Sequence, residues 1–179
     1  DGLQNEPRLL SLAQRLLLIN RLAESGLQRI EVGAFVSPKR VPQMADSAEL
    51  FEALPRKGAT RYGALVPNLQ GLQAAIAARV DEIGLFTACS DGFTRANIGI
   101  GVEESLIRFA PLVTEARRLG IKVRGYLSTV IACPYDGPTR PKRVAALAER
   151  LLDLGCHEIS LGDTIGVGTP GTVAPMLDA

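Results

Sequence analysis

The sequence is poor in aromatic side chains: it has no tryptophan, one histidine and only 4% Phe, Tyr and Trp in a chain of 179 residues. A surface that binds bases or sugars mainly by stacking is therefore not expected. Because His157 is the only histidine, these residues cannot supply two histidine ligands to a metal site. The net charge of +1 argues against a basic surface for nucleic acid or for an anionic membrane.

Long apolar runs and an even set of cysteines are absent as well. No run of about 18 apolar residues is present to span a bilayer. The three cysteines, Cys89, Cys133 and Cys156, are an odd number at wide spacing, which predicts free thiols in a reducing compartment. The remaining composition, 46% hydrophobic and 22% charged, is that of a globular chain with enough length for one core.

Predicted strands and helices alternate along the chain. Apolar runs bounded by glycine and proline predict five strands, at residues 27–32, 60–66, 81–88, 121–132 and 157–163. Helical spacing predicts six helices, at residues 11–24, 47–54, 69–79, 101–119 and 141–154, and from Thr169 as N-cap onward. Strand starts recur roughly every 33 residues, the size of a βαβ unit. This alternation predicts one α/β domain, residues 1–179, around a parallel sheet.

Two ways of closing that sheet compete. A doubly wound sheet would be complete at this length, whereas a TIM (β/α)8 barrel needs about 250 residues. The barrel is favoured because the first helix has no strand before it and the last has none after it. The G-x-G-x-x-G marker of dinucleotide folds is also missing after the first strand. We therefore predict an incomplete TIM barrel that lacks strands 1, 7 and 8, with Asp1 following the absent first strand.

Three carboxylates are candidates for the chemistry, because a βα barrel carries its active site at the carboxyl ends of its strands. Glu31 and Asp163 stand at predicted strand ends, and Asp1 is the third if a strand precedes it. Carboxylates that converge repel one another unless a cation, a shared proton or an arginine lies between them. A hard divalent ion such as Mg²⁺ accepts such oxygen ligands. The alternative for each carboxylate alone is a helix cap or an arginine pair, but the set of three favours a functional site.

Two long connections follow predicted strand ends. Residues 160–171, SLGDTIGVGTPG, contain four glycines and lead into a capped helix, where free N–H groups attract anions. The alternative is a connection that only needs positive φ angles, but its low charge favours a ligand loop. Residues 34–46 form the other connection, in which Lys39 and Arg40 could meet phosphates or could simply be solvated.

The residues that a chemist would test first are poorly placed. His157 lies at the amino end of its predicted strand, on the face of a barrel associated with stability, so a Ser-His-Asp arrangement has no support. Cys133 follows a predicted strand end, but no basic neighbour that would favour a thiolate is obvious. Cys89 and Cys156 are interpreted as packing residues.

Five segments together point to a family. They are DGLQNE (1–6), IEVGAFVSPKRVPQMAD (30–46), LVPNLQG (65–71), CPYDG (133–137) and EISLGDTIGVGTPG (158–171). In this order, and over the full length of the chain, they resemble the 3-hydroxy-3-methylglutaryl-CoA lyase family. These are metal-dependent lyases with an Arg-Asp pair after the first strand of a TIM barrel. The last segment is the most specific, whereas DG-x-Q is shared with isopropylmalate and homocitrate synthases.

The resemblance implies cleavage of 3-hydroxy-3-methylglutaryl-CoA to acetyl-CoA and acetoacetate with a divalent metal, Mg²⁺ or Mn²⁺. It implies that Asp1 is a metal ligand and a catalytic residue, and that Glu31 and Asp163 are catalytic residues lining the same mouth. Gln4 and Ser160 would shape the substrate pocket. It further implies an acyl-CoA substrate, a homo-oligomer (a dimer) at full length, and a cytoplasmic location in a bacterium or a mitochondrial one in a eukaryote.

The resemblance also has departures. The family's arginine before Asp1, its His-x-His and Asn metal ligands and its catalytic cysteine find no match in these residues, so the 179 residues alone are expected to be inactive. Pro7 stands where family members often have lysine. Two alternatives remain: a Claisen-type acyltransferase of the same superfamily, and a non-catalytic half-barrel that binds a partner through its open edges.

Overall fold

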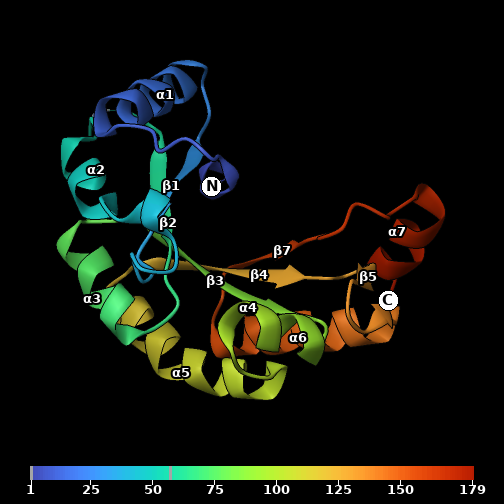
Figure 1. Ribbon diagram of the computed structural model, residues 1–179. Coiled ribbons are helices and arrows are strands. Elements are labelled where there is room, and N and C mark those ends of the chain that lie inside the picture. Colours follow the sequence, from blue (N-terminus) through green and yellow to red (C-terminus); the bar gives the residue numbers. More distant parts are fainter. Residues whose placement is uncertain (1, 57) are drawn as a thin grey trace. The chain divides into compact units, whose positions relative to one another are not determined.

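The computed structural model describes residues 2–56 and 58–179, and the chain divides into two compact units, residues 1–84 and 85–179 (Figure 1). Five strands form one sheet in the order β1-β2-β3-β4-β7, in which the pairs β1–β2, β2–β3 and β4–β7 are parallel. This agrees with the predicted five-stranded parallel sheet. Strand β3 (Glu82–Ala88) begins in the first unit and ends in the second.

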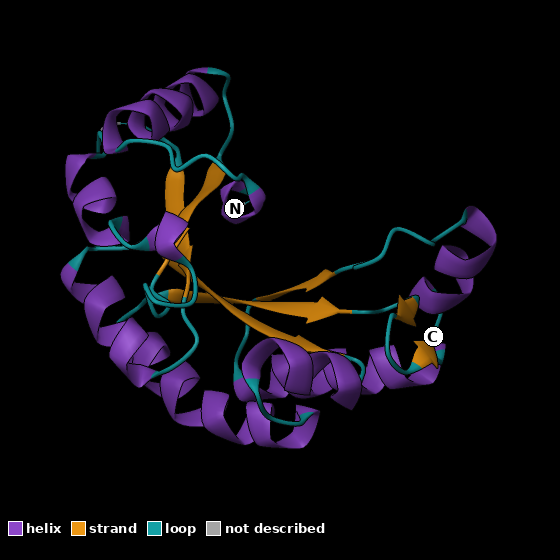
Figure 2. Cartoon of the chain, viewed as in Figure 1, coloured by secondary structure: helices purple, strands orange, loops and turns teal. Residues whose placement is uncertain are grey.

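The first unit alternates helices and strands, as Figure 2 shows. Its elements are η1 (Leu3–Asn5), α1 (Leu12–Glu24), β1 (Arg29–Ala34), η2 (Pro42–Met44), α2 (Ser47–Ala53), β2 (Arg61–Leu65) and α3 (Leu69–Ala77). Helix α1 begins where the sequence predicts, because Ser11 and Gln14 form a capping box in which each side chain accepts from the other residue's backbone N–H. Asn68 caps α3 in a similar way, accepting from the N–H of Gly71 at 2.8 Å.

The core of the first unit lies between β1 and the helices α1 and α2, which pack against that strand (Figure 1). Ile30 and Val32 are buried, and Leu50 and Phe51 of α2 are fully buried. Burial of such side chains away from water is the main stabilising contribution to the unit. The strand alternation leaves Glu31, between two buried neighbours, on the opposite face.

A buried cation holds the long loop that follows β1. The side chain of Arg15 in α1 is only 3% exposed; its Nη1 donates to the carbonyl of Gln43 at 2.9 Å, and its Nη2 pairs with the carboxylate of Asp46. A buried charge is stable only when it is paired and hydrogen-bonded. Arg15 therefore anchors η2, which in turn packs against η1.

The second unit contains the end of β3 and the rest of the chain. Its further elements are α4 (Asp91–Ile98), α5 (Val102–Arg118), β4 (Lys122–Ser128), β5 (Ala132–Cys133), β6 (Gly137–Pro138), α6 (Pro141–Leu154), β7 (Glu158–Leu161) and α7 (Pro170–Leu177). Helices α5 and α6 pack against each other and against β4 (Figure 1). Helix α5 buries Leu106, Phe109 and Val113, which recur at helical spacing. No helix of the described residues is both long and apolar enough to cross a membrane.

Helix α4 lies between the predicted strand 81–88 and the predicted helix 101–119, where the sequence predicted no element. Ser90 caps it by accepting from the N–H of Phe93 at 3.2 Å, and Gly99, with φ 79°, ends it. The carboxylate of Asp91 accepts from the N–H of Val102 at 2.7 Å. It thereby caps α5, whose own N-cap residue, Gly101, has no side chain to do so.

Strand β4 is shorter than the predicted strand 121–132. It ends at Ser128, because Thr129 takes a left-handed conformation with φ 57° that an extended strand cannot continue. Ala132 and Cys133 therefore do not lie at the end of β4, as the sequence predicted. They form one arm of the separate antiparallel hairpin β5–β6.

The three cysteines are free, as predicted, and all three are buried, although the sequence predicted packing roles only for Cys89 and Cys156. Burial raises the pKa of Cys89 from 9.0 to about 12, against the opposing effect of Arg143, and burial raises the pKa of Cys156 to about 11. Because the pKa values of these two thiols in the folded state exceed 9.0, the protonated thiols favour the folded state. Their contribution to the free energy of unfolding is complete below pH 9.0 and is lost as the pH rises from 9.0 toward the folded-state pKa values.

We expect the free energy of unfolding to fall above about pH 9, by up to about 1.4 kcal/mol per pH unit for each protonated thiol. Urea unfolding of reduced protein between about pH 8 and pH 11 measures the slope. Cys89→Ala should make that slope shallower, whereas Cys133→Ala, a matched control, should not. Equal slopes for the wild type and Cys89→Ala would contradict the assignment.

Candidate functional site

The predicted site residues fall in both units. Asp1 lies outside the described residues. Gln4 is half-buried in η1 of the first unit, and Glu31 is half-buried in β1 of the same unit. Ser160 and Asp163 belong to the second unit, where Ser160 is in β7 and Asp163 follows that strand. The structure thus brings Ser160 and Asp163 to one strand and its loop, while the gathering of all the carboxylates at one mouth stays a prediction.

Glu31 is not at a strand end, contrary to the sequence-based expectation. It is the third of the six residues of β1 and pairs with Gly63 of β2. The strand continues because the small residues Gly33 and Ala34 pair with β2, although such residues are weak strand formers. The register shifts between Glu31 and Gly33, so the pairing of β1 with β2 is irregular directly beside the carboxylate. Irregular pairing of this kind, as in a β-bulge, commonly redirects a neighbouring side chain.

Asp163 is held by its own loop. Its Oδ2 accepts from the N–H of Gly168 at 2.6 Å, and its carbonyl accepts from the N–H of Gly166 at 3.1 Å. Its other carboxylate oxygen, Oδ1, is buried and accepts no hydrogen bond from any described residue. A buried carboxylate oxygen without a donor is costly, so Oδ1 is the atom of this site that a cation or a substrate hydroxyl would satisfy.

Gly168 is required by that geometry. A Cβ at this position would lie 2.8 Å from Asp163 Oδ2, closer than side-chain carbons approach oxygens. The glycine-rich composition of residues 163–169 therefore lets the backbone close around one carboxylate oxygen. This favours the interpretation of the segment as a ligand loop over that of a simple connection.

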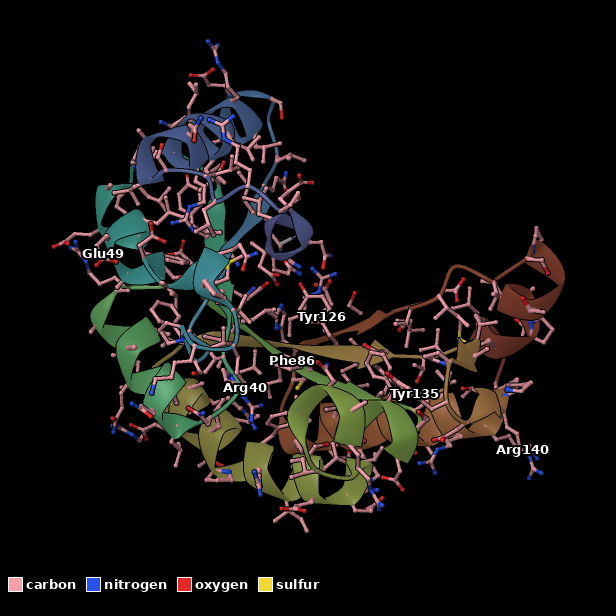
Figure 3. All side chains as sticks on the ribbon, in the orientation of Figure 1. Arg40, Glu49, Phe86, Tyr126, Tyr135 and Arg140 are labelled. Atoms are coloured by element: carbon pink, nitrogen blue, oxygen red, sulfur yellow. The ribbon has the colours of Figure 1, made fainter. Side chains whose placement is uncertain are left out.

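Metal ligands are not grouped among the described residues: no three His, Cys, Asp or Glu side chains of residues 2–56 and 58–179 lie close enough to hold an ion. The predicted ligand Asp1 is outside that set. Lys39 and Arg40 are exposed at the surface of the first unit, and Figure 3 labels Arg40. His157 precedes β7, as predicted, and its Nδ1 lies 2.8 Å from the carbonyl oxygen of Val123, a backbone contact.

Cys133 has a more polar environment than the sequence indicated. Its sulfur accepts from Ser90 Oγ at 2.8 Å and from the N–H of Tyr135 at 3.3 Å. Burial opposes ionisation, but these bonds and one from the backbone of Asp136 lower the pKa of Cys133 below its usual value. The missed signal was not a basic neighbour but the N-cap serine of α4, an element that the sequence did not predict.

A cavity of about 390 Å³ lies in the second unit, and its lining includes Cys89 and the Ser90 that donates to Cys133. Asp136 also lines it, as do Arg140, the N-cap residue of α6, and Arg143 in the first turn of that helix. Figure 3 labels Arg140, and it labels Tyr135 in the turn between β5 and β6. The Tyr135 ring lies 6.5 Å from that of Phe93 in α4, so the hairpin packs on the same helix that carries Ser90.

Comparison with known proteins assigns a family: the HMGL-like family model matches residues 1–179. The chain belongs to the HMGL-like family. A curated HMGL-like relative from Pseudomonas aeruginosa, named 3-hydroxy-3-isohexenylglutaryl-CoA/hydroxy-methylglutaryl-CoA lyase, is 47% identical over 179 residues, which are 100% of this chain and 60% of the relative. The hydroxymethylglutaryl-CoA lyase of Pseudomonas mevalonii is 50% identical over 178 residues, 99% of this chain and 59% of that protein.

A solved structure of the family supports the fold. The HMG-CoA lyase from Brucella melitensis matches with a TM-score of 0.97 and 53% identity, covering 99% of this chain and 63% of that one. This confirms the predicted partial TIM barrel and the family resemblance. The chain spans about 60% of the length of the curated HMGL-like relatives described above.

Gly168→Ala tests the contact between the glycine loop and Asp163. The added methyl group would displace the carboxylate, so the amide of residue 168 should lose its hydrogen bond and exchange with solvent about tenfold faster or more. Hydrogen exchange measured by NMR reads this directly. Gly171→Ala is the matched control, because its Cβ would meet only Thr169 Oγ1, at an ordinary 3.8 Å. Unchanged exchange at residue 168 in Gly168→Ala would show that the contact does not hold the loop.

Proposed function

We propose that the protein carrying these residues is a metal-dependent carbon–carbon lyase that cleaves 3-hydroxy-3-methylglutaryl-CoA to acetyl-CoA and acetoacetate. One observation carries the proposal: the chain matches relatives named as such lyases at 47% and 50% identity along essentially its whole length. The glycine loop around Asp163 supports it, since that loop keeps one carboxylate oxygen buried and free of donors among the described residues.

The reaction is a retro-aldol-type cleavage. A base removes the proton of the substrate's tertiary hydroxyl, and the oxygen forms the ketone of acetoacetate as the carbon–carbon bond breaks. The bonding electrons pass to the carbon beside the thioester and give the enolate of acetyl-CoA. Protonation of that carbon then yields acetyl-CoA. Carboxylates that orient the hydroxyl and exclude water would contribute through positioning and electrostatics.

Two described carboxylates have proposed roles. Asp163 would present Oδ1 to the hydroxyl end of the substrate, while Oδ2 stays bound to Gly168. Glu31, beside the register shift of β1, would orient polar groups at the same mouth. Ser160, paired with Tyr126 in the β4–β7 ladder, and Gln4 of η1 would shape the pocket for the acyl group.

A divalent ion, Mg²⁺ or Mn²⁺, is part of the proposal. Asp163 Oδ1 is an oxygen of the hard type that these ions prefer, but the described residues supply no group of three ligands. The proposed ligand is Asp1, which lies outside them. When bound, such an ion would polarise the oxygens of the substrate. The described residues would orient the acyl chain and keep water out of the pocket.

The acyl group is the least determined part of the substrate. The name of the P. aeruginosa relative gives both a methyl and an isohexenyl substituent, and both substrates share the 3-hydroxyglutaryl-CoA core. The shared chemistry is therefore a tertiary alcohol between a carboxylate and a thioester. A Claisen-type acyltransferase, which would join acetyl-CoA to a 2-oxo acid, is the competing proposal. We further propose a homodimer, in the bacterial cytoplasm or in the mitochondrion.

The protein encoded by the complete gene should release acetoacetate from 3-hydroxy-3-methylglutaryl-CoA in the presence of Mg²⁺. Asp163→Asn should lower kcat about 100-fold or more, because it removes the charge but keeps an oxygen for the N–H of Gly168. Glu24→Gln is the control, since Glu24 is an exposed carboxylate paired with Arg21 at 3.3 Å. Product formation only from acetyl-CoA and a 2-oxo acid would establish the acyltransferase instead, and no turnover of either substrate set would favour a binding module.

Removal of divalent ions should abolish this activity. After treatment with a chelator and its removal, we expect acetoacetate release to fall to the background rate and to return when Mg²⁺ or Mn²⁺ is added. The circular dichroism spectrum of the treated protein controls for unfolding. Full activity in the metal-free protein would contradict the metal part of the proposal while leaving the lyase activity intact.

A further inference from the structure

Thr129 has an unusual backbone for its residue type. It follows β4 directly, it is fully buried, and its φ of 57° places a β-branched side chain in the left-handed region. Such a conformation is unfavourable for a threonine and persists only where the surrounding contacts hold it. Strained positions of this kind are frequent at functional sites.

Two backbone N–H groups at this turn donate hydrogen bonds to the residues on either side of Asp163. The N–H of Thr129 donates to Thr164 Oγ1 at 2.8 Å, and the N–H of Val130 donates to the carbonyl of Gly162 at 3.1 Å. Gly162 and Thr164 are the sequence neighbours of Asp163. The turn after β4 therefore fixes the backbone of the β7 loop at the two residues that flank the proposed catalytic carboxylate.

The remaining polar groups of Thr129 bind other loops of the second unit. Its Oγ1 accepts from the N–H of Cys89 at 3.2 Å and donates to the carbonyl of Ser128 at 2.7 Å. Its carbonyl accepts from Thr139 Oγ1 at 2.6 Å. One buried residue thus joins the end of β3, the end of β4, the segment before α6 and the loop after β7. An extended residue at 129 would continue the strand and would not form this turn.

We propose that Thr129 is a positioning residue, which acts through Thr164 to hold the Asp163 loop at the carboxyl end of β4. The inference rests on the proposed function for the role of Asp163, but not for the placement of its loop. The carboxylate has no described donor on Oδ1 to orient it, so its position depends on the backbone on both sides. The Gly168 contact fixes the far end of the loop, and the Thr129–Thr164 bond fixes the near end.

Thr164→Val tests this proposal because it keeps the shape of an exposed side chain and removes the acceptor for the N–H of Thr129. In the full-length protein we expect hydrogen exchange at Thr129 and through residues 163–168 to rise about tenfold. We expect kcat to fall about tenfold while KM for the thioester changes less than about twofold. Thr164→Ser, which retains the hydroxyl, should restore both values.

Thr114→Val is the matched control. The Thr114 hydroxyl is exposed on α5 and donates to the carbonyl of Ala110 at 2.9 Å, so this variant loses a comparable bond far along the chain from the loop. A lowered Tm in Thr164→Val with unchanged kcat and exchange would overturn the proposal, since the bond would then be structural only. A loss that Thr164→Ser does not restore would also overturn it. Absence of lyase activity in the wild type would refute the proposed function, and the exchange data would then decide the placement of the loop.

Discussion

Parallel pairing of the strands is the constraint on which the rest of the molecule depends. A parallel pair needs a crossover that returns the chain to the starting end of the sheet, and here every crossover contains a helix. The helices cover apolar strand faces, as the almost complete burial of β3 shows. Each strand then opens at its carboxyl end into a loop, and these loops contain the residues with the most unusual contacts, Thr129 and Asp163.

The sequence predicted the order and type of most elements because its signals are local. The capping box at Ser11, the cap and proline at Thr169 and Pro170, and glycines after helices all act within a few residues. Helix α4 was missed because its short polar sequence has no clear apolar period, and it is stabilised from outside. The hydroxyl of Ser90 caps it, and the carboxylate of Asp136, which is distant in sequence, accepts from the N–H of Gly92 at 2.8 Å.

The candidate site was predictable in its residue types but not in its contacts. The position of Asp163 after a strand followed from the pattern, whereas the use of one oxygen by its own loop depends on how residues 163–168 fold back. Glu31 was placed at a strand end because the predicted strand stopped at residue 32, whereas β1 continues through Gly33 and Ala34, which pair with β2 despite their low strand propensity. Thr129 gave no signal at all, since threonine is typical of strands and its left-handed turn is held by contacts with three distant segments.

The hydrogen bond from the N–H of Val102 to the carboxylate of Asp91 joins the start of α4 to the start of α5. Asp91 is the first residue of α4, and α5 has no capping side chain of its own. Fraying of the first turn of α4 would therefore withdraw the acceptor from the start of the longer helix, whose apolar face belongs to the core. A disturbance beside the carboxyl end of β3 would in this way reach the start of α5 through the Asp91 carboxylate, in addition to the buried hydrogen bond of 2.8 Å between the Thr87 and Ser105 hydroxyls.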